Sequence, residues 1–357
     1  MSDHEFEPFG LSTDTIHRLD SDLEWVALFQ QGREEEAYTQ LAKDVAFPEM
    51  MSHIRADPGE QDTLPLRQLQ YMIAWSARDR GQTGIRVPTK ATGFQIAVAG
   101  GGPAGLAAAI RLLEKGHDVH LFEREGRLGG APALLYPEDR LPDPQDEIAA
   151  RLQPAIQAGR LTVSLRHAVS RDTWPQGDDA VLLTTGCWNE TSLGTIKGVW
   201  SALRFLREAR DGHCTTVPEK VAVLCGGDAA MDVAVTARNL GAKQLDLIFE
   251  TPRESAYWHL PDSWFDKPGV GTRFGILPTG YRAEMDGAVS GVVLENDEVI
   301  DAEMVIEAMG LYADNVDTRS AALFTAGALA NGGASVQQCM REGFAVADDI
   351  DLYLQSK

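Results

Sequence analysis

The sequence QIAVAGGGPAGLAAAIRLLEKGHDVHLFEREGRLGG, residues 95–130, decides how the rest of the chain can fold. Two apolar runs, at 96–98 and 119–122, flank a helix-forming run at 106–115. Between the first run and the helix, three glycines stand at G-x-G-x-x-G spacing: Gly100, Gly102 and Gly105. The second run ends on Glu123, about 20 residues past the glycines, where a ribose-binding carboxylate belongs. The stretch therefore predicts a dinucleotide-binding unit.

Each glycine of this pattern has a physical role. Gly100 permits a tight turn, Gly102 lets the backbone approach a pyrophosphate, and Gly105 lets the helix pack close to the strand. The amino-terminal end of the helix then faces the anion. The alternative interpretation is a glycine-rich turn in an α/β domain that binds no nucleotide.

Composition and charge restrict the class of partner. The chain has 357 residues, 44% hydrophobic and 24% charged, which is typical of a globular protein of two or three domains. Its formal net charge of −21 argues against binding to nucleic acid or to an anionic membrane, and suits a basic or neutral protein partner. No apolar run approaches the roughly 20 residues that span a bilayer, and the start MSDHEFEPFG lacks a signal-peptide pattern. We expect a cytoplasmic protein.

The sequence gives no signal for a metal site or a disulfide. The four cysteines are far apart and include no C-x-x-C: Cys187, Cys214, Cys225 and Cys339. We expect free thiols, without an iron–sulfur cluster or a zinc site. The eight histidines include no H-x-x-x-H or H-E-x-x-H pattern. His117 and His120, which flank the second strand of the unit, are expected at the surface rather than on a metal.

Residues 1–90 predict a small helical cap. Apolar residues recur at helical spacing in three segments: 22–31, 34–45 and 67–80. A loop rich in Pro, Gly, Asp and Glu is expected at 53–66. Three methionines are expected to fill the core of the cap: Met50, Met51 and Met72.

After Gly130 the pattern alternates between helices and strands. We expect a proline-rich loop at 131–142 and an amphipathic helix at 198–209, with Trp200 on or near its apolar side. Between them we expect one helix and two strands: 145–159, 161–165 and 180–184.

A second unit repeats the architecture of the first. A buried-strand run at 221–224, the turn CGGDAAMD, a helix at 229–240 and a strand at 245–249 precede Glu250. Two units imply two nucleotides, most economically a flavin and a nicotinamide. The alternative is a duplicated domain that keeps only its shape. The remaining chain predicts a hairpin, a strand and a final helix: 291–300, 304–310 and from about 334.

With these segments in place, the chain resembles the glutamate synthase small-subunit family, which also includes the amino-terminal part of dihydropyrimidine dehydrogenase. The resemblance covers nearly the whole chain. Its motifs keep the order and spacing of the family: FPEMMSHIRADPGE (47–60), GGGPAGLAAAIRLLEKGHDVHLFEREGRLGG (100–130), PEDRLP (137–142), LLTTG (182–186), GVWSALRFL (198–206), GGDAAMD (226–232), EAMG (307–310) and GALANGGASV (327–336).

The resemblance implies an α/β fold with two Rossmann-like domains of the disulfide-reductase type, FAD on the first and NAD(P)H on the second. The chain would have three parts: 1–90 as the helical cap, 91–195 with 311–357 for FAD, and 196–310 for NAD(P). Hydride would pass from nicotinamide to flavin, and then to a small acceptor or a partner redox protein. The chain's own work would be positioning and electronic tuning, so no catalytic residue is assigned.

The resemblance also implies which residues contact the two nucleotides. They are, in chain order, Gly100, Gly102, Pro103, Ala104, Gly105, Glu123, Arg124, Gly130, Arg140, Thr185, Gly186, Gly227, Asp228, Ala230, Glu250, Gly310, Gly327, Ala328, Ser335 and Val336.

Departures from the family concern first the iron–sulfur cysteines and the flavin. The family has a pattern like C-P-x-P-C-E-x-x-C where this chain has other residues: Arg55, Gly59 and Thr63. Without thiolates no cluster is expected. The family's tyrosine-glycine pair beside the flavin is Leu134 and Leu135, and leucine lacks the backbone freedom of glycine. The family's glycine-aspartate pair is Gly327 and Ala328, which loses a hydrogen bond to the flavin worth about 1.5 to 3 kcal/mol.

Further departures lie in the second unit. Its first glycine is Cys225, which favours negative φ and is expected to be a small buried hydrophobe rather than a redox group. The family's arginine pair for the 2′-phosphate of NADPH is Glu250 and Thr251. Because a carboxylate accepts hydrogen bonds from ribose and repels a phosphate, NADH is expected over NADPH. Arg253 is close enough to offset this, although its ordinary role is that of a solvated loop residue.

Two questions of function stay open at this point. Four aromatic residues either line a partner surface or pack against the neighbouring domain: Tyr257, Trp258, His259 and Trp264. The clustered departures also suit a non-catalytic, flavin-binding subunit of a larger redox complex. An FAD-dependent amine or amino-acid oxidase with a vestigial second unit is a weaker alternative, because nothing marks a site for a substrate carboxylate.

Overall fold

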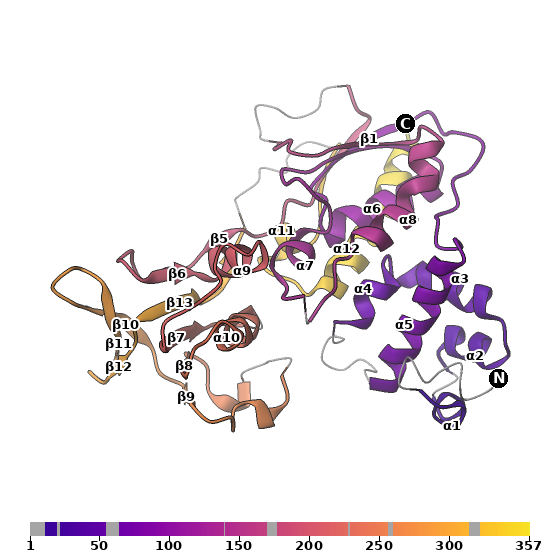
Figure 1. The fold of residues 1–357 in the computed structure, drawn as a ribbon. Coiled ribbons are helices and arrows are strands. Elements are labelled where there is room, and N and C mark those ends of the chain that lie inside the picture. Colours follow the sequence, from indigo (N-terminus) through magenta and orange to yellow (C-terminus); the bar gives the residue numbers. More distant parts are fainter. Residues whose placement is uncertain are drawn as a thin grey trace. The chain divides into compact units, whose positions relative to one another are not determined.

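The computed structural model describes eight stretches of the chain: 11–19, 22–54, 64–138, 140–169, 177–227, 229–255, 260–313 and 322–357. Figure 1 shows their helices and strands. The chain forms two compact units. The first unit contains residues 1–133, 140–187 and 313–357, and the second contains 134–139 and 188–312.

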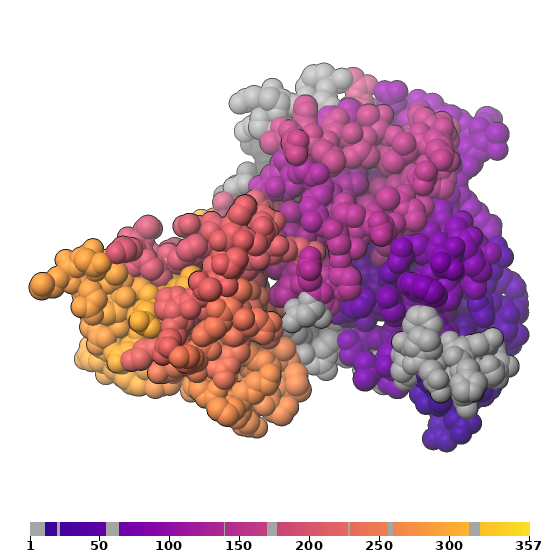
Figure 2. Space-filling view, viewed as in Figure 1, coloured from indigo at the N-terminus to yellow at the C-terminus, as the bar shows by residue number. Residues whose placement is uncertain are grey.

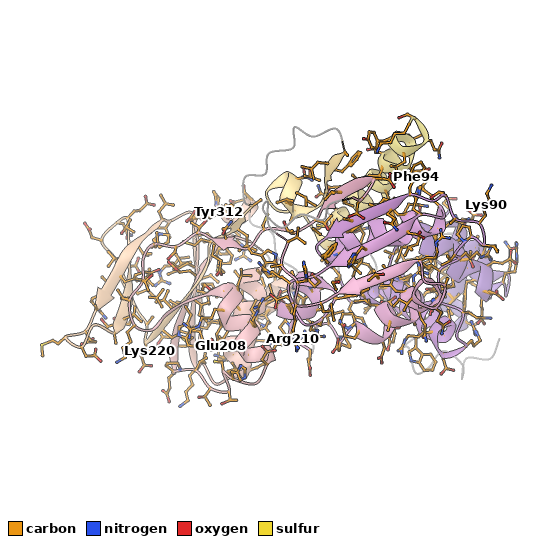
Figure 3. The ribbon with its side chains drawn as sticks, turned by 90° about the horizontal axis from the view of Figure 1, so that it is seen from above. Lys90, Phe94, Glu208, Arg210, Lys220 and Tyr312 are labelled. Carbon is orange, nitrogen blue, oxygen red and sulfur yellow. The ribbon has the colours of Figure 1, made fainter. Side chains whose placement is uncertain are left out.

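The first unit is built on a five-stranded parallel sheet in the order β15-β4-β1-β2-β3. Its strands are β1 (Gln95–Ala99), β2 (Asp118–Phe122), β3 (Leu161–Ser164), β4 (Ala180–Leu183) and β15 (Leu323–Thr325). The linker that enters β1 carries Lys90 and Phe94, both labelled in Figure 3. Parallel strands joined by helices are the expected Rossmann-like arrangement, which confirms the predicted α/β class.

Two helices of the first unit pack unusually closely. They are α6 (Pro103–Glu114) and α12 (Val336–Gln355). A methyl group on Gly343 of α12 would overlap the carbonyl oxygen of Ala104 in α6. Only glycine permits this backbone approach, so α12 lies directly against the first turn of α6.

The described residues of the cap form five helices within the same unit: α1 (Thr13–His17), α2 (Glu24–Gln30), α3 (Glu34–Asp44), α4 (Pro48–Ser52) and α5 (Leu64–Asp79). The three predicted cap helices are confirmed, and Met50, Met51 and Met72 are buried as expected. The sequence did not reveal α1 or α4, because five residues are too short to show helical periodicity. In Figure 2 the indigo and violet surface of the cap continues into the magenta surface of the nucleotide-binding part.

Helix α8 (Gln145–Gln157) fastens the cap to the sheet. The buried carboxylate of Glu147 accepts the backbone N–H groups of Glu49 and Met50, at 2.7 and 2.8 Å, in the first turn of α4. One turn later the buried guanidinium of Arg151 donates to the carbonyl oxygens of Ala46 and Thr83. The bonds to Glu147 satisfy N–H groups that the first turn of α4 leaves without partners of its own, and the bonds from Arg151 hold two loop carbonyl groups of the cap.

The second unit has its own five-stranded parallel sheet in the order β6-β13-β7-β8-β9. Its strands are β6 (Val199–Ser201), β7 (Lys220–Cys225), β8 (Gln244–Phe249), β9 (Val270–Phe274) and β13 (Met304–Ala308). The helices are α9 (Ala202–Arg210) and α10 (Ala229–Asn239), with short 3₁₀ turns at Arg253–Ser255 and Asp262–Trp264. Glu208 and Arg210 on α9 and Lys220 at the start of β7 are labelled in Figure 3.

An antiparallel sheet packs on the second unit's parallel sheet. Its strands are β10 (Pro278–Ala283), β11 (Val289–Leu294) and β12 (Val299–Asp301). Val292 of β11 and Val305 of β13 are buried in one hydrophobic core, which holds the two sheets together. The predicted hairpin is thus confirmed, with an additional strand on its other side. This unit also contains a two-stranded antiparallel ribbon of β5 (Asn189–Glu190) and β14 (Leu311–Tyr312). Tyr312 is labelled in Figure 3.

Two expected elements are corrected. The segment expected to be a loop at 131–142 begins as a helix, α7 (Gly130–Leu135), because the run of small and apolar residues before Tyr136 suits a helix despite Pro132 in its first turn. The expected helix at 198–209 begins as strand β6, with Trp200 paired to Ile306 of β13. Ser201 then caps α9 by accepting the N–H of Arg204.

The histidine expectation is also corrected. His117 is fully buried, where its ring contacts Asp351 at 3.2 Å and the Thr92 hydroxyl at 2.7 Å. His120 is half-buried within β2, where it stacks on Phe122 of the same strand and contacts the Ser164 hydroxyl at 2.8 Å. The correction therefore concerns His117, whose side chain packs between elements. All four cysteines are free thiols, as expected. Among the described residues, no helix is both long and apolar enough to cross a membrane.

Stability should depend on pH through Glu147. Burial raises the pKa of this carboxyl to about 8, against the opposing effects of its two N–H donors and Arg151. A carboxyl whose pKa is raised by folding stabilises the fold below its unfolded pKa, and that contribution is lost as the pH rises through the folded value. We expect the free energy of unfolding to fall by up to about 1.4 kcal/mol per pH unit between about pH 5 and pH 8 from this one group. Denaturant titrations of wild type and Glu147→Gln measure it, and parallel curves for the two proteins would contradict it.

Candidate dinucleotide-binding sites

The first candidate site is the amino-terminal end of α6. Gly100 has φ of +114°, and a methyl group there would overlap the carbonyl oxygen of Thr184. A methyl group on Gly105 would overlap the carbonyl oxygen of Gly100. The Thr184 hydroxyl also donates to the carbonyl oxygens of Ala99 and Gly100. These contacts bring the end of β1, the end of β4 and the first turn of α6 together.

Gly102 differs from its two neighbours in the motif. It is the N-cap residue of α6 with ordinary φ of −83°, and the nearest atom to a methyl group there is the Cα of Gly130, at 3.7 Å. Protein packing therefore does not require glycine at this position. A ligand backbone that approaches the N–H groups of α6 does require it, so the open position fits a pyrophosphate. Pro103 and Ala104, both expected among the cofactor contacts, begin the helix, which starts three residues before the run expected at 106–115.

Glu123 follows β2 on one side of this turn. Its buried carboxylate accepts the N–H of Gly101 at 2.7 Å and the N–H of Glu125 at 2.8 Å. A carboxylate has about four lone-pair positions, so it can still accept hydrogen bonds from ribose hydroxyls. Arg124 beside it is exposed and pairs with Glu125.

The Gly327 turn lies on the other side of α6. Gly327 has φ of +73°, and a methyl group there would stand 2.8 Å from the Cβ of Ala104. Ala328 begins the short helix α11 (Ala328–Asn331), and its carbonyl oxygen accepts the thiol of Cys187. The site thus receives residues from the ends of β1, β2, β4 and β15.

The remaining residues expected at the first site lie after β4, at the start of α12 and around α7. Thr185 and Gly186 follow β4 directly, with Thr185 exposed. Ser335 caps α12 by accepting the N–H of Gln338, and Val336 is the first residue of that helix. The expected flavin-side loop is different: Leu134 and the buried Leu135 continue helix α7, where a glycine would permit a turn. Arg140 is half-buried.

The second candidate site follows β7. Cys225 is buried, as expected, and burial raises the pKa of its thiol. Cys225, Gly226 and Gly227 all lack positive φ, so this turn differs from that of the first unit. A methyl group on Gly226 would stand 2.5 Å from the carbonyl carbon of Met309, whereas one on Gly227 would meet nothing within 4 Å. Gly227 is therefore the open position of this unit, and Ala230 is buried in α10.

The strand ends beside this turn carry the other expected residues. Glu250 and Thr251 follow β8 and are exposed, and Gly310, with φ of +117°, follows β13. The guanidinium of Arg253 lies 5.6 Å from the ring centre of Phe274 and 4.0 Å from Asp262. Phe274 stacks on Phe249 at 4.5 Å between ring centres. Arg253 is thus held against the end of β9.

Some expectations fall on residues outside the described stretches: Arg55, Gly59, Thr63, Asp228, Tyr257, Trp258 and His259. Trp264 is buried.

Sequence reasoning missed Thr184, Gly226 and Glu342. The first two stand inside recognised motifs, LLTTG and CGGDAAMD, where their contacts could have been sought. Glu342, which accepts the N–H of Gly327, is a single glutamate in a helical pattern and carries no such signal.

Two Rossmann-like units, each with an open glycine position before a helix, define an oxidoreductase that binds two dinucleotides. The family model "Pyridine nucleotide-disulphide oxidoreductase" matches residues 94–341, and the chain belongs to this family. It is thus an FAD-dependent NAD(P)H oxidoreductase by class.

Curated relatives agree with the predicted resemblance. The chain is 27% identical to "Glutamate synthase [NADPH] small chain" of Mycobacterium tuberculosis, over 93% of this chain and 83% of that one. It is 26% identical to "NAD-dependent dihydropyrimidine dehydrogenase subunit PreT" of Escherichia coli, over 77% and 72% of the two chains. The resemblance to the glutamate synthase small-subunit family is therefore confirmed.

The fold also matches solved structures. The thioredoxin reductase of Lactococcus lactis superposes with a TM-score of 0.56 at 15% identity, over 74% of this chain and all of that one. This likeness confirms the disulfide-reductase type of the two Rossmann-like units.

The two glycines of α6 should respond differently to substitution. Gly102→Ala introduces a methyl group that the protein accommodates, so the free energy of unfolding of the apoprotein should change by less than about 1 kcal/mol, while the affinity for FAD falls at least about tenfold. Gly105→Ala should destabilise the apoprotein by about 1 to 3 kcal/mol, because its methyl group overlaps the Gly100 carbonyl. Denaturation and FAD titration of both variants test this contrast. Wild-type FAD affinity in Gly102→Ala would contradict the placement of the pyrophosphate.

Proposed function

We propose that the first unit binds FAD, that the second binds NADH in preference to NADPH, and that the protein passes electrons from NADH to a small acceptor or a partner protein. The observation that carries this proposal is the open glycine position before a helix in each unit, Gly102 and Gly227. When bound, a reduced nicotinamide supplies a hydride and the flavin accepts it.

The chain's own residues would bind and orient the two cofactors. In the first unit, the N–H groups of α6 would hold the pyrophosphate and Glu123 would accept the ribose hydroxyls. We propose that residues 91–195 and 311–357 form this FAD-binding part, and that 196–310 form the NAD(P)-binding part. The remaining expected contacts, from Arg124, Gly130 and Arg140 to Ser335 and Val336, belong to the same proposal.

The preference for NADH rests on the end of β8. Glu250 is exposed there, so its carboxylate would repel the 2′-phosphate of NADPH and accept bonds from a free ribose. Arg253, the nearby cation, already lies against Phe274 and beside Asp262. The names of the relatives do not decide between NADH and NADPH, because one name includes NADPH and the other includes NAD.

The route by which electrons leave the protein is part of the proposal. Arg55, Gly59 and Thr63 stand where the family pattern has cysteines, so we propose that the protein carries no iron–sulfur cluster of its own. The cap would then serve as a structural module fixed by Glu147 and Arg151. Electrons would pass from the flavin directly to the acceptor.

A second candidate function is a non-catalytic, flavin-binding subunit of a larger redox complex. The continuation of α7 through Leu135, where a glycine turn would lie beside the flavin, favours it. So does the altered turn at Cys225 in the second unit. Robust NADH turnover by the purified protein alone would exclude this candidate. Copurification of a partner whose activity survives removal of the flavin would support it.

The purified protein should contain flavin without iron. Its visible spectrum should show oxidised flavin that bleaches on anaerobic addition of NADH, because the two cofactors would be held by the same chain. Metal analysis serves as the control for the absent cluster. Flavin that neither NADH nor NADPH reduces would overturn the enzymatic proposal, and stoichiometric iron would overturn the proposed electron route.

Nucleotide preference should depend on Glu250. Glu250→Ala removes the charge that repels a 2′-phosphate and the acceptor for ribose, so the ratio of kcat/KM for NADH to that for NADPH should fall by about tenfold or more. Glu254→Ala, an exposed glutamate four residues along, is the matched control and should leave the ratio unchanged. An unchanged ratio in Glu250→Ala would show that another group selects the nucleotide.

A further inference from the structure

Glu342 collects three hydrogen bonds at the turn beside α6. Its carboxylate accepts the backbone N–H of Gly327 at 2.9 Å, the side-chain amide of Asn331 at 2.6 Å and the side-chain amide of Gln338 at 2.9 Å. Two of these donors belong to the turn at 327–331 and one belongs to α12. A carboxylate bonded in this way fixes the turn to the helix.

The position of this turn follows from two close contacts with Ala104. Gly327 lies against the Cβ of Ala104, and Gly343, the residue after Glu342, lies against its carbonyl oxygen. Ala104 is in the first turn of α6. Glu342 is therefore one residue away from the point where α12, the turn and the proposed pyrophosphate site meet.

The order of the strands shows on which side of α6 the turn at 327–331 lies. Glu123 follows β2, whereas the turn follows β15, and β1 and β4 lie between these two strands. If the ribose of a dinucleotide lies at Glu123 and its pyrophosphate at α6, the other half of the molecule extends towards β15. That half is the flavin half of FAD, and it would meet the turn held by Glu342.

We propose that Glu342 is a positioning residue for the flavin half of FAD. It would act through the backbone of Gly327, whose N–H it accepts and whose φ of +73° forms the turn. Ala328, the next residue, has no polar side chain. The carboxylate that is hydrogen-bonded to this turn is that of Glu342 on α12. This inference rests on the proposed binding of FAD to the first unit.

Glu342→Gln tests the inference, because an amide places an N–H group towards donors that need an acceptor. FAD and ADP are titrated separately into the apoprotein. We expect the Kd for FAD to rise about tenfold or more, and the Kd for ADP, which lacks the flavin half, to stay within about twofold. Asp349→Asn, which removes an exposed charge from the same helix, should change neither constant.

A second variant keeps the test decisive if Glu342→Gln folds poorly. Asn331→Ala removes one exposed donor from the turn, and it should weaken FAD by roughly threefold without weakening ADP. Equal weakening of FAD and ADP, or unchanged FAD affinity, would overturn the role of Glu342. Failure of the wild-type protein to bind FAD would instead overturn the proposed function, so the two failures are distinguishable.

Discussion

The first unit depends on how closely α6 approaches the strands beneath it. Gly100 and Gly105 have no side chain to separate the backbones of the β1 turn, the end of β4 and the first turn of the helix. Gly343 likewise lets the backbone of α12 lie against the backbone of α6. Because the backbones touch, the N–H groups at the start of α6 stand at the crossing of four strand ends. The packing of α6 against the strands therefore fixes where the proposed dinucleotide site lies.

The attachment of the cap rests on two buried residues of α8. Glu147 and Arg151 lie one turn apart on α8 and are buried against the backbone of the cap. Because both side chains make hydrogen bonds to the backbone of the cap, these two residues couple the cap to the nucleotide-binding sheet.

The two units show different degrees of departure from the same architecture. The first retains positive φ at Gly100, while Cys225 and its neighbours build the corresponding turn of the second without it. The sheet order and the open glycine are nevertheless present in both. In this chain the conformation of the strand-to-helix turn and the presence of an open glycine position are therefore separate features.

The sequence by itself determined the elements that carry strong local patterns. The two βαβ units, the long cap helices, the burial of Cys225 and the family follow from glycine spacing and apolar periodicity, which are properties of neighbouring residues. Only the tertiary structure decided that 130–135 form a helix, that Trp200 lies in a strand, and that Glu147 and Glu342 hold segments about 100 and 15 residues away. A single glutamate on a helix has no pattern that names its partner, because that partner is chosen by how the helices pack.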